Sequence, residues 1–381
     1  MAMALVLDGE QRAALAVVRS LVRHGVNVQV GSSQAGPLAS KSRGVTASHV
    51  LPAPERSASR FLESMREFPA TSILPVTDAS TMLLRSRPGG GDEGYEQLTD
   101  KAALLSLAAA HGVPAPRSGV VFSITDAAKT AGRLGYPVVL KPARSKVLLD
   151  DRVVATTVRV ARDAAELERA LSTAPWFPQL PVIVQEFIAG HGAGVFCLYD
   201  GDRALAWFAH RRLREKPPSG GVSVLCESVP VDPLLRGHAE SLLRAARYRG
   251  VAMVEFRMGT DGSPYLMEVN ARFWGSLQLA VDCGVDFPWL YWQLLQGVPV
   301  KPVEDYVIGR RLRWLLGDFD NLLLQFRDPT LGMAHRWAVV RRFVGTALDG
   351  RCRQEVFRWS DPSPGLLESR LWLTDVLARG V

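Results

Sequence analysis

The sequence has few cysteines, and they are not arranged to act together. Its 381 residues include four cysteines, which lie far apart at Cys197, Cys226, Cys283 and Cys352. Because no C-x-x-C pair is present, neither a disulfide framework nor a cysteine-bound zinc site is predicted. We therefore expect a protein of a reducing compartment, located in the cytoplasm.

Long apolar runs are also missing. No stretch of about 18 uncharged apolar residues occurs, so the sequence predicts no membrane span. The apolar start at residues 1–7 meets Asp8 almost at once and has no basic segment before it, which favours a β-strand over a signal peptide. Hydrophobic residues make up 47% of the chain and charged residues 22%, as in globular proteins. A chain of this length suggests about two or three domains.

Positive charge exceeds negative charge only mildly. The formal net charge is +7, and only seven of the 45 basic residues are lysines. No basic run concentrates the excess, so it fits a small anionic ligand as well as nucleic acid. Because RNP, helix-turn-helix and zinc-finger patterns are missing, a non-enzymatic nucleic-acid or nucleotide-binding module is the weaker alternative.

The chain opens with a predicted strand, helix and strand. Residues 3–7 and 26–30 are short apolar runs, and residues 11–24 carry apolar side chains at helical spacing. This β-α-β pattern predicts a parallel sheet. The turn at residues 8–10 reads Asp-Gly-Glu rather than G-x-G-x-x-G, so dinucleotide binding loses its main sequence support.

Further along, short strands and helices alternate as in an α+β domain. Residues 72–76 and 153–160 are each predicted to form one strand. The glycine-rich segment at 87–94 predicts a domain boundary, and the polar, glycine- and proline-rich segment at 210–221 predicts a basic mobile loop. From about residue 301 the pattern is mostly helical and rich in arginine and tryptophan.

The most informative segment is a predicted β-hairpin around the Asp-Gly pair at residues 261–262. A turn centred on this pair places Glu255 directly opposite Glu268, with the two Cβ atoms roughly 4.5–5.5 Å apart. Asn270 lies two residues beyond Glu268 and projects from the same face. Three oxygen-bearing side chains therefore share one small patch.

Such a patch predicts a divalent cation site. Hard oxygen ligands suit Mg²⁺, which leaves coordination positions for substrate phosphates. Arg272, two residues after Asn270, has a guanidinium that suits a phosphate oxygen. The competing interpretation is solvated charge on an edge strand. Apolar residues between the carboxylates favour a buried hairpin, in which carboxylates must be paired or bind metal.

Five motifs in order resemble those of the ATP-grasp superfamily, the carboxylate–amine ligases and their relatives. They lie between residues 99 and 272 and read Thr-Asp-Lys at 99–101, Gly-Val-Pro-Ala-Pro at 112–116, Gly-Tyr-Pro-Val-Val-Leu-Lys-Pro at 135–142, Val-Gln-Glu-Phe-Ile at 184–188 and Met-Glu-Val-Asn-Ala-Arg at 267–272. Order and spacing together carry the resemblance, which covers roughly half of the chain, from about residue 100 to residue 297.

The resemblance implies a multidomain fold of α/β and α+β units. A Rossmann-like N-terminal domain of the kind that precedes an ATP-grasp unit is expected at residues 1–94. The ATP-grasp domain follows at 95–300, as two α+β subdomains with a hinge near 185–190. A mostly helical C-terminal extension occupies 301–381.

The resemblance also implies roles for residues at matching positions. Lys101 and Lys141 match the lysines that contact ATP phosphates. The hinge strand whose backbone meets adenine corresponds to Gln185, Glu186, Phe187 and Ile188. The metal ligands correspond to Glu255, Glu268 and Asn270, for two Mg²⁺ ions with Mn²⁺ as an alternative. Arg272 matches the residue that steadies the transferred phosphoryl group, and the basic segment offers Arg212 and Arg214 to hold an acylphosphate or a substrate carboxylate.

Two segments depart from the family pattern. The flap that usually carries glycines reads as a basic stretch at residues 143–151, where Arg144, Ser145 and Lys146 would close over phosphates by charge. After the hinge the usual acidic ribose ligand is missing, which leaves His191 as the candidate in its place.

The reaction implied by the resemblance joins a carboxylate to an amine with ATP, through an acylphosphate, and releases ADP. The expected partners are small-molecule carboxylate and amine substrates, with contacts from the Thr77–Asp78 turn, and no membrane or nucleic acid. A homodimer is left open. The alternatives within the superfamily are carboxylation and kinase-like phosphoryl transfer.

Overall fold

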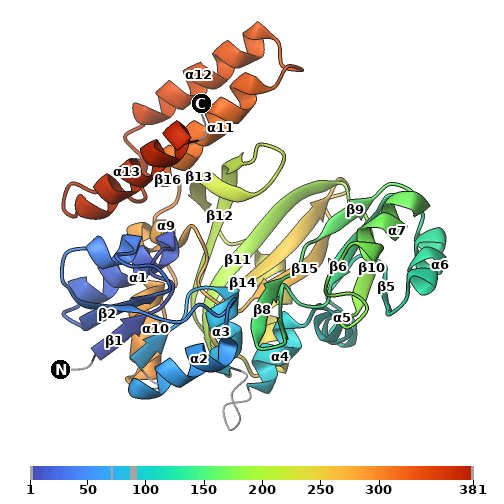
Figure 1. Cartoon of the computed structure of the whole chain (residues 1–381), viewed down its shortest axis with the longest axis horizontal. Helices are drawn as coiled ribbons and strands as arrows, with labels where there is room; N and C mark the ends of the chain where they lie inside the picture. Colours follow the sequence, from blue (N-terminus) through green and yellow to red (C-terminus); the bar gives the residue numbers. More distant parts are fainter. Residues whose placement is uncertain (1–2, 70–71, 86–91, 379–381) are drawn as a thin grey trace.

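The structure is a computed structural model that describes residues 3–69, 72–85 and 92–378. Its N-terminal part is a four-stranded parallel sheet in the order β3-β2-β1-β4, of which β1 and β2 are labelled in Figure 1. The strands are β1 (Met3–Val6), β2 (Asn27–Ser32), β3 (Val45–Val50) and β4 (Ile73–Leu74), and the helices are α1 (Arg12–Arg23), α2 (Ala58–Ser64), α3 (Asp78–Arg85) and the short 3-10 turns Leu38–Lys41 and Met65–Glu67. The predicted β-α-β start is confirmed, and β4 is shorter than the strand predicted at 72–76.

The next unit is a four-stranded antiparallel sheet covered by two helices. Its order is β5-β10-β6-β9, and its elements are β5 (Ser118–Val121), β6 (Val138–Pro142), β9 (Arg159–Ala161), β10 (Val182–Glu186), α6 (Ile124–Leu134) and α7 (Ala164–Ser172). A separate hairpin joins β7 (Lys146–Leu149) to β8 (Arg152–Ala155).

The prediction of one strand over 153–160 is wrong. The chain leaves β8 at Thr156, whose Oγ1 donates to the Arg144 carbonyl at 2.6 Å. That bond closes the base of the hairpin, so the residues that follow join the antiparallel sheet as β9.

A seven-stranded sheet forms the centre of the molecule, in the order β15-β14-β11-β12-β13-β16-β17. Its strands are β11 (Gly190–Asp200), β12 (Ala204–Lys216), β13 (Val222–Val229), β14 (Arg249–Gly259), β15 (Pro264–Asn270), β16 (Arg311–Arg313) and β17 (Cys352–Gln354). Alternate residues of β11 pack on opposite faces, as a period of two requires. Phe196 packs toward the N-terminal part and Cys197 toward the other face.

Helices cover both faces of this sheet. The face shared with α1 carries α9 (Leu277–Cys283) and α10 (Phe287–Leu295), so one apolar core joins the N-terminal sheet to the central sheet. The other face carries α4 (Glu93–Thr99), α5 (Lys101–Ala110) and α8 (Pro233–Ala245). Part of the linker predicted at 87–94, residues 86–91, lies outside the described residues, and the division at residue 94 stays a prediction.

The prediction of a mobile loop at 210–221 is wrong for residues 210–216, whereas residues 217–221 form the turn between two strands. Residues 210–216 continue β12, and β13 begins at Val222, which pairs with Lys216. The polar side chains that suggested a loop are satisfied by distant carboxylates. Arg211, for example, places its Nε 2.8 Å from Glu227 Oε2.

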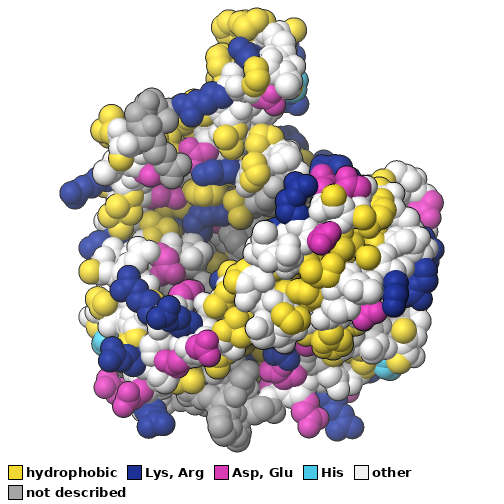
Figure 2. Space-filling view, turned by 45° about the vertical axis from the view of Figure 1, so that its right-hand side comes forward, with side chains coloured by type: hydrophobic (Ala, Val, Ile, Leu, Met, Phe, Trp, Pro, Cys, Tyr) yellow, Lys and Arg dark blue, Asp and Glu magenta, His cyan; other side chains and the backbone are white. Residues whose placement is uncertain are grey.

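The C-terminal extension is mostly helical, as predicted. Helices α11 (Leu315–Arg327), α12 (Met333–Ala347) and α13 (Ser363–Ala378) project from the rest of the molecule (Figures 1 and 2). The strands β16 and β17 of the same segment extend the central sheet. None of the described helices is both long and apolar enough to cross a lipid bilayer.

A buried ion pair attaches the extension to the N-terminal part. Arg19 of α1 places its Nε 2.8 Å from Asp361 Oδ2. The same carboxylate accepts bonds from Ser42 Oγ at 2.7 Å and from the Arg43 N–H at 2.9 Å. These donors outweigh burial and lower the pKa of Asp361.

Asp361→Asn should therefore destabilise the protein by about 3 kcal/mol, because Arg19 is left buried without a countercharge. Urea unfolding at pH 7 measures this loss. Asp305→Asn, at an exposed position, should change stability by less than about 0.5 kcal/mol. A lowered pKa stabilises the fold above the ordinary pKa of 3.8. The difference between Asp361→Asn and the unsubstituted protein should thus shrink as the pH falls below about 4. Equal stability of the two at pH 7 would contradict this reasoning.

Candidate active site

The two predicted glutamates face each other on the hairpin of β14 and β15. Glu255 pairs with Glu268 across the antiparallel ladder, which confirms the predicted register. The turn is longer than the predicted Asp-Gly pair, because the Gly259 N–H donates to the Ser263 carbonyl at 2.8 Å. A bulge at Met267 compensates for the longer turn and restores the register at the glutamates.

Asn270 joins the two carboxylates. Its Nδ2 donates to Glu255 Oε1 and to Glu268 Oε1, both at 3.2 Å. Burial and the nearby Glu268 charge raise the pKa of Glu255 to about 7. Burial alone would raise the pKa of Glu268 as well, but the Lys101 charge and the Asn270 hydrogen bond lower it. Glu268 therefore keeps its negative charge more readily than Glu255.

This group of oxygen atoms fits a divalent cation. A cation would relieve the repulsion between Glu255 and Glu268, and Mg²⁺ commonly binds one or two carboxylates while substrate phosphates and water fill its other positions. Within the described residues, no group of three histidine, cysteine, aspartate or glutamate side chains is placed to hold a metal ion, so the candidate donors here are two carboxylates and an amide.

Two lysines from different elements reach the carboxylates. Lys101 begins α5, and its Nζ lies 2.9 Å from Ser145 Oγ and 3.3 Å from Glu268 Oε2. Lys141 lies in β6, and its Nζ is 3.4 Å from Met267 Sδ. Burial lowers the pKa of Lys141 to about 8, although Glu268 acts in the opposite direction. Both ammonium groups therefore lie where charge is concentrated.

Two arginines also adjoin the carboxylates. Arg212 of β12 places its Nη2 3.6 Å from Glu255 Oε1. Arg272 places its Nη2 3.2 Å from Asn270 Oδ1 and its Nε 2.7 Å from Asp78 Oδ1. Asp78 belongs to the N-terminal part, so Arg272 connects that part to the site.

The start of α3 is held in position by Asp8. This carboxylate, at the end of β1, accepts hydrogen bonds from the Thr77 N–H at 2.7 Å and from Ser80 Oγ at 2.6 Å. The predicted Thr77–Asp78 turn thus lies at the site, where it orients Arg272 through Asp78. The turn at residues 8–10 positions α3 and has no glycine-rich phosphate loop.

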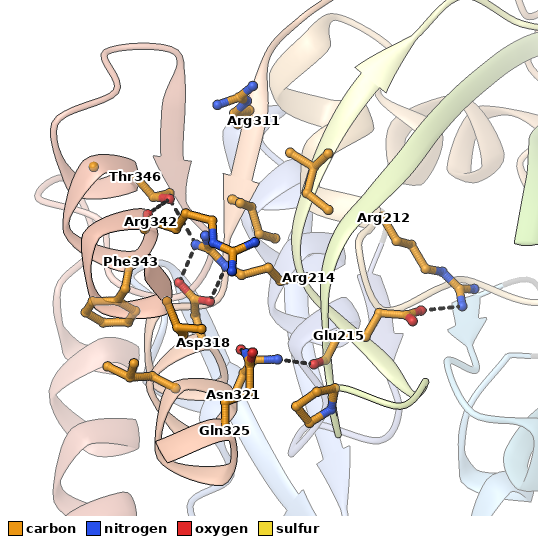
Figure 3. A pocket seen from close by; sticks show the side chains of 16 residues that line it. Arg212, Arg214, Glu215, Arg311, Asp318, Asn321, Gln325, Arg342, Phe343 and Thr346 are labelled. Atoms are coloured by element: carbon orange, nitrogen blue, oxygen red, sulfur yellow. Dashed lines mark hydrogen bonds and ion pairs between the residues drawn. The ribbon is translucent and has the colours of Figure 1, made fainter. Parts of the chain in front are cut away.

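Arg214 points away from the glutamates. Its Nε and Nη2 lie 2.6 and 2.7 Å from the two carboxylate oxygens of Asp318 in α11. Irregular pairing of β12 around Leu213 turns Arg212 and Arg214 in different directions (Figure 3). A role for Arg214 in holding an acylphosphate stays a prediction.

The segment predicted as a hinge runs from the end of β10, in the four-stranded sheet, to the start of β11 in the central sheet. Gln185 is buried at the end of β10, and Phe187 is 44% exposed. Glu186 is fixed by Arg117, whose Nε lies 2.6 Å from Glu186 Oε2 and whose carbonyl accepts the Glu186 N–H at 2.9 Å. Beyond the strand, the Ile188 carbonyl accepts a bond from Arg257 Nε at 3.2 Å. The sequence did not predict the Arg117 and Arg257 contacts, because neither residue lies in a motif.

His191 is exposed at the start of β11, where it pairs with Met258. Its side chain has no recorded hydrogen bond or ion pair among the described residues. A role in ribose binding stays a prediction.

The flap is the hairpin of β7 and β8, and its tip is docked on the N-terminal part. Asp150 and Asp151 form the turn with φ angles of 44° and 65°. The Asp151 carboxylate accepts bonds from Ser57 Oγ at 2.7 Å and from the Ser59 N–H at 2.7 Å. Its backbone carbonyl also accepts the Ala58 N–H at 2.7 Å. This attachment involves residues about 90 positions apart, so no local pattern could indicate it.

A narrow cavity lies beneath the flap. It has a volume of about 30 Å³. The charged and polar residues that line it include Asp78, Lys101, Arg144, Ser145, Lys146, Glu268 and Asn270. Arg144, predicted to act by charge, is paired with Glu96 at 2.6 Å and Asp100 at 3.3 Å. The volume of this cavity is smaller than the several hundred Å³ that small-molecule sites occupy.

Comparison with known proteins finds similarity in both sequence and fold. Residues 179–315 match a family model described as ATP-grasp in the biosynthetic pathway with Ter operon. The matched segment includes the hinge strand, both glutamates, Asn270 and Arg272. This segment of the chain is therefore similar to ATP-grasp domains.

Curated relatives are similar over about half of this chain. The chain is 27% identical over 196 residues to the carbamoyl phosphate synthase large chain of Beutenbergia cavernae, which covers 48% of this chain and 17% of that protein. It is 28% identical over 187 residues to the D-alanine–D-alanine ligase of Cupriavidus metallidurans, which covers 45% of this chain and 53% of that protein.

Solved structures share the ATP-grasp fold over most of the chain. A biotin carboxylase from Campylobacter jejuni superposes with a TM-score of 0.61 at 16% identity, over 81% of this chain and 74% of that one. An L-amino acid ligase from Bacillus licheniformis superposes with a TM-score of 0.55 at 19% identity, over 82% and 78%. The N-terminal sheet, the two α+β units and the order of the elements agree with the fold that the sequence predicted.

Loss of the flap attachment should be measurable. Asp151→Ala removes the carboxylate that binds Ser57 and Ser59, so amides of residues 146–155 should exchange hydrogen at least about tenfold faster, as local opening becomes easier. Asp150→Ala is the matched control, because it places alanine at another positive φ in the same turn without removing that carboxylate. Similar exchange in both variants would show that turn strain, rather than the attachment, controls the flap.

Proposed function

We propose that the protein is an ATP-dependent, ADP-forming ligase that joins a carboxylate to an amine through an acylphosphate. The observation that carries the proposal is the convergence of two carboxylates, two lysines and two arginines around the hairpin of β14 and β15, beside a small cavity lined by Lys101, Glu268 and Asn270. These charges match the needs of phosphoryl transfer, in which positioning and neutralisation matter more than a protein nucleophile.

The proposed roles follow from the contacts of each group. Lys101 and Lys141 bind phosphate oxygens, and Glu255, Glu268 and Asn270 hold Mg²⁺. The metal, when bound, neutralises phosphate charge. Burial and the flap exclude water, which protects an acylphosphate from hydrolysis.

The proposed chemistry has two steps. A carboxylate oxygen of the substrate attacks the γ-phosphorus, the bond to the β-phosphate oxygen breaks, and ADP leaves. The amine nitrogen then attacks the acyl carbon, phosphate leaves, and the amine loses a proton. Arg272 is placed to stabilise the charge of the transferred phosphoryl group.

The names of similar proteins support a ligase more than other activities. They include a D-alanine–D-alanine ligase, an L-amino acid ligase and a phosphoribosylamine–glycine ligase. Biotin carboxylase is also among them, so carboxylation is the second candidate. ADP release that needs bicarbonate would favour it over amine ligation. Salt-sensitive nucleic-acid binding without ADP release would favour a binding module.

Glu268→Gln should lower Mg²⁺-dependent ADP release by about 100-fold or more, because a neutral amide binds the cation weakly. The measurement is a coupled ADP assay over a matrix of acids and amines. Glu168→Gln, at an exposed position, should retain full activity, and thermal unfolding should show that both variants fold. Full activity of Glu268→Gln would remove this residue from the metal site.

Arg272→Ala should lower kcat by about 100-fold or more while changing ATP affinity by less than about threefold, because the guanidinium acts on charge that develops during transfer. Asp78→Asn keeps Arg272 and weakens only its orientation, so kcat should fall less in this variant than in Arg272→Ala. A collapse of ATP affinity in Arg272→Ala would instead make Arg272 a nucleotide-binding residue.

A further inference from the structure

A second cavity lies beside the candidate active site, between the central sheet and the C-terminal extension (Figure 3). Its volume is about 530 Å³, within the range of about 300–1,000 Å³ that small-molecule sites occupy. The ends of β12 and β13 form one wall, and α11 and α12 form the other. The cavity therefore exists only because the extension packs beside the sheet.

Positive charge predominates in this cavity. Its charged lining residues are Arg212, Arg214, Arg311, Arg342, Glu215 and Asp318. The four arginines exceed the two carboxylates by two charges. Such an excess in a concave site favours an anionic ligand.

Three of these arginines have carboxylate partners, and Arg212 is one of them through Glu215. Arg214 binds Asp318, which also binds the buried Arg313 at 2.7 Å. Arg311 lies 2.9 Å from Glu227 and 2.8 Å from Asp349. These ion pairs form part of the cavity wall. The carboxylates take up most of the hydrogen-bonding capacity of the guanidinium groups of Arg214 and Arg311.

Arg342 differs from them. Among the described residues, no ion pair is recorded for its guanidinium, and the recorded hydrogen bond of its side chain is from Nε to the Ala338 carbonyl at 3.3 Å. Figure 3 shows its side chain reaching from α12 toward Arg214 and the cavity. The end of the guanidinium is therefore available to a ligand, beside a second positive charge.

Arg212 connects this cavity to the glutamates. Its Nη1 lies 3.1 Å from Glu215 Oε1, in the cavity lining, and its Nη2 lies 3.6 Å from Glu255 Oε1. A molecule that extends from Arg342 past Arg212 would thus bring its far end to the metal and phosphate groups.

We propose that this cavity binds the carboxylate substrate and that this substrate carries a second oxyanion, a carboxylate or a phosphate, which Arg342 binds. The reacting carboxylate lies at the Arg212 end, next to Glu255. The inference rests on the proposed ligase function and names the class of acid that it uses. Uncharged neighbours in the wall, such as Asn321 and Phe343, leave Arg342 as the main determinant of this selectivity.

The test compares acids that differ mainly in the second anionic group. ADP release is measured with glutamate against 2-aminopentanoate, aspartate against 2-aminobutyrate, and O-phosphoserine against serine, each with a mixture of amines. The anionic member of at least one pair should have a KM about tenfold or more lower, since a charge-assisted hydrogen bond contributes about 1.5–3 kcal/mol. The glutamate and aspartate pairs test whether the second oxyanion is a carboxylate, and the O-phosphoserine pair tests whether it is a phosphate.

Arg342→Gln should remove this preference by raising the KM of the anionic acid, with the KM for ATP unchanged. Arg342 is exposed, so the variant should fold. Arg341→Gln is the matched control, because it removes the neighbouring charge of the same helix outside the cavity lining, and it should keep the preference. A preference for the neutral acids, or equal effects of the two variants, would overturn the proposal.

Failure of the ligase proposal can be told apart from failure of this one. If no acid supports ADP release, calorimetry with glutarate and with inorganic phosphate tests the cavity alone. Binding that Arg342→Gln weakens about tenfold or more, and Arg341→Gln does not, would support the anion site without ligase activity. Absence of such binding, together with absence of turnover, would overturn it.

Discussion

Repulsion between two carboxylates is the constraint on which the site depends. Glu255 and Glu268 oppose each other on neighbouring strands, where like charges destabilise a sheet. The surrounding groups all lower that cost. Asn270 donates to both carboxylates, Lys101 lies 3.3 Å from Glu268, and Arg212 lies 3.6 Å from Glu255. A site built this way suits a divalent cation, and our proposal is that this cation binds a polyphosphate.

The parts of the chain meet around that pair, and several of them contribute a polar or charged contact. The N-terminal sheet supplies Asp78, which orients Arg272. The flap hairpin places Ser145 beside Lys101, and its tip is attached to the N-terminal part through Asp151. The C-terminal extension closes a second, basic cavity next to the first. Side chains around the carboxylate pair therefore also connect the units to one another.

The hairpin was predictable because its information is local. Alternation with a period of two and a turn signal place Glu255 opposite Glu268, and this pairing holds although the turn is longer than predicted, since a bulge at Met267 offsets it. The end of β12 was not predictable. Its polar side chains, such as Arg214, are typical of a loop. They are accommodated in a strand because Asp318, 104 positions along the chain, binds Arg214.

By itself, the sequence determined the element types near the motifs, the order of the ATP-grasp units and most of the residues that converge on the cavity beneath the flap. These depend on hydrogen bonding and side-chain alternation over a few residues. Only the tertiary structure decided which charges are already paired. Arg214 and Arg144 are held by carboxylates from other elements, whereas Arg342 faces a cavity. Ion pairs between distant segments depend on how whole units pack against each other. The spacing of residues along the chain does not predict this packing.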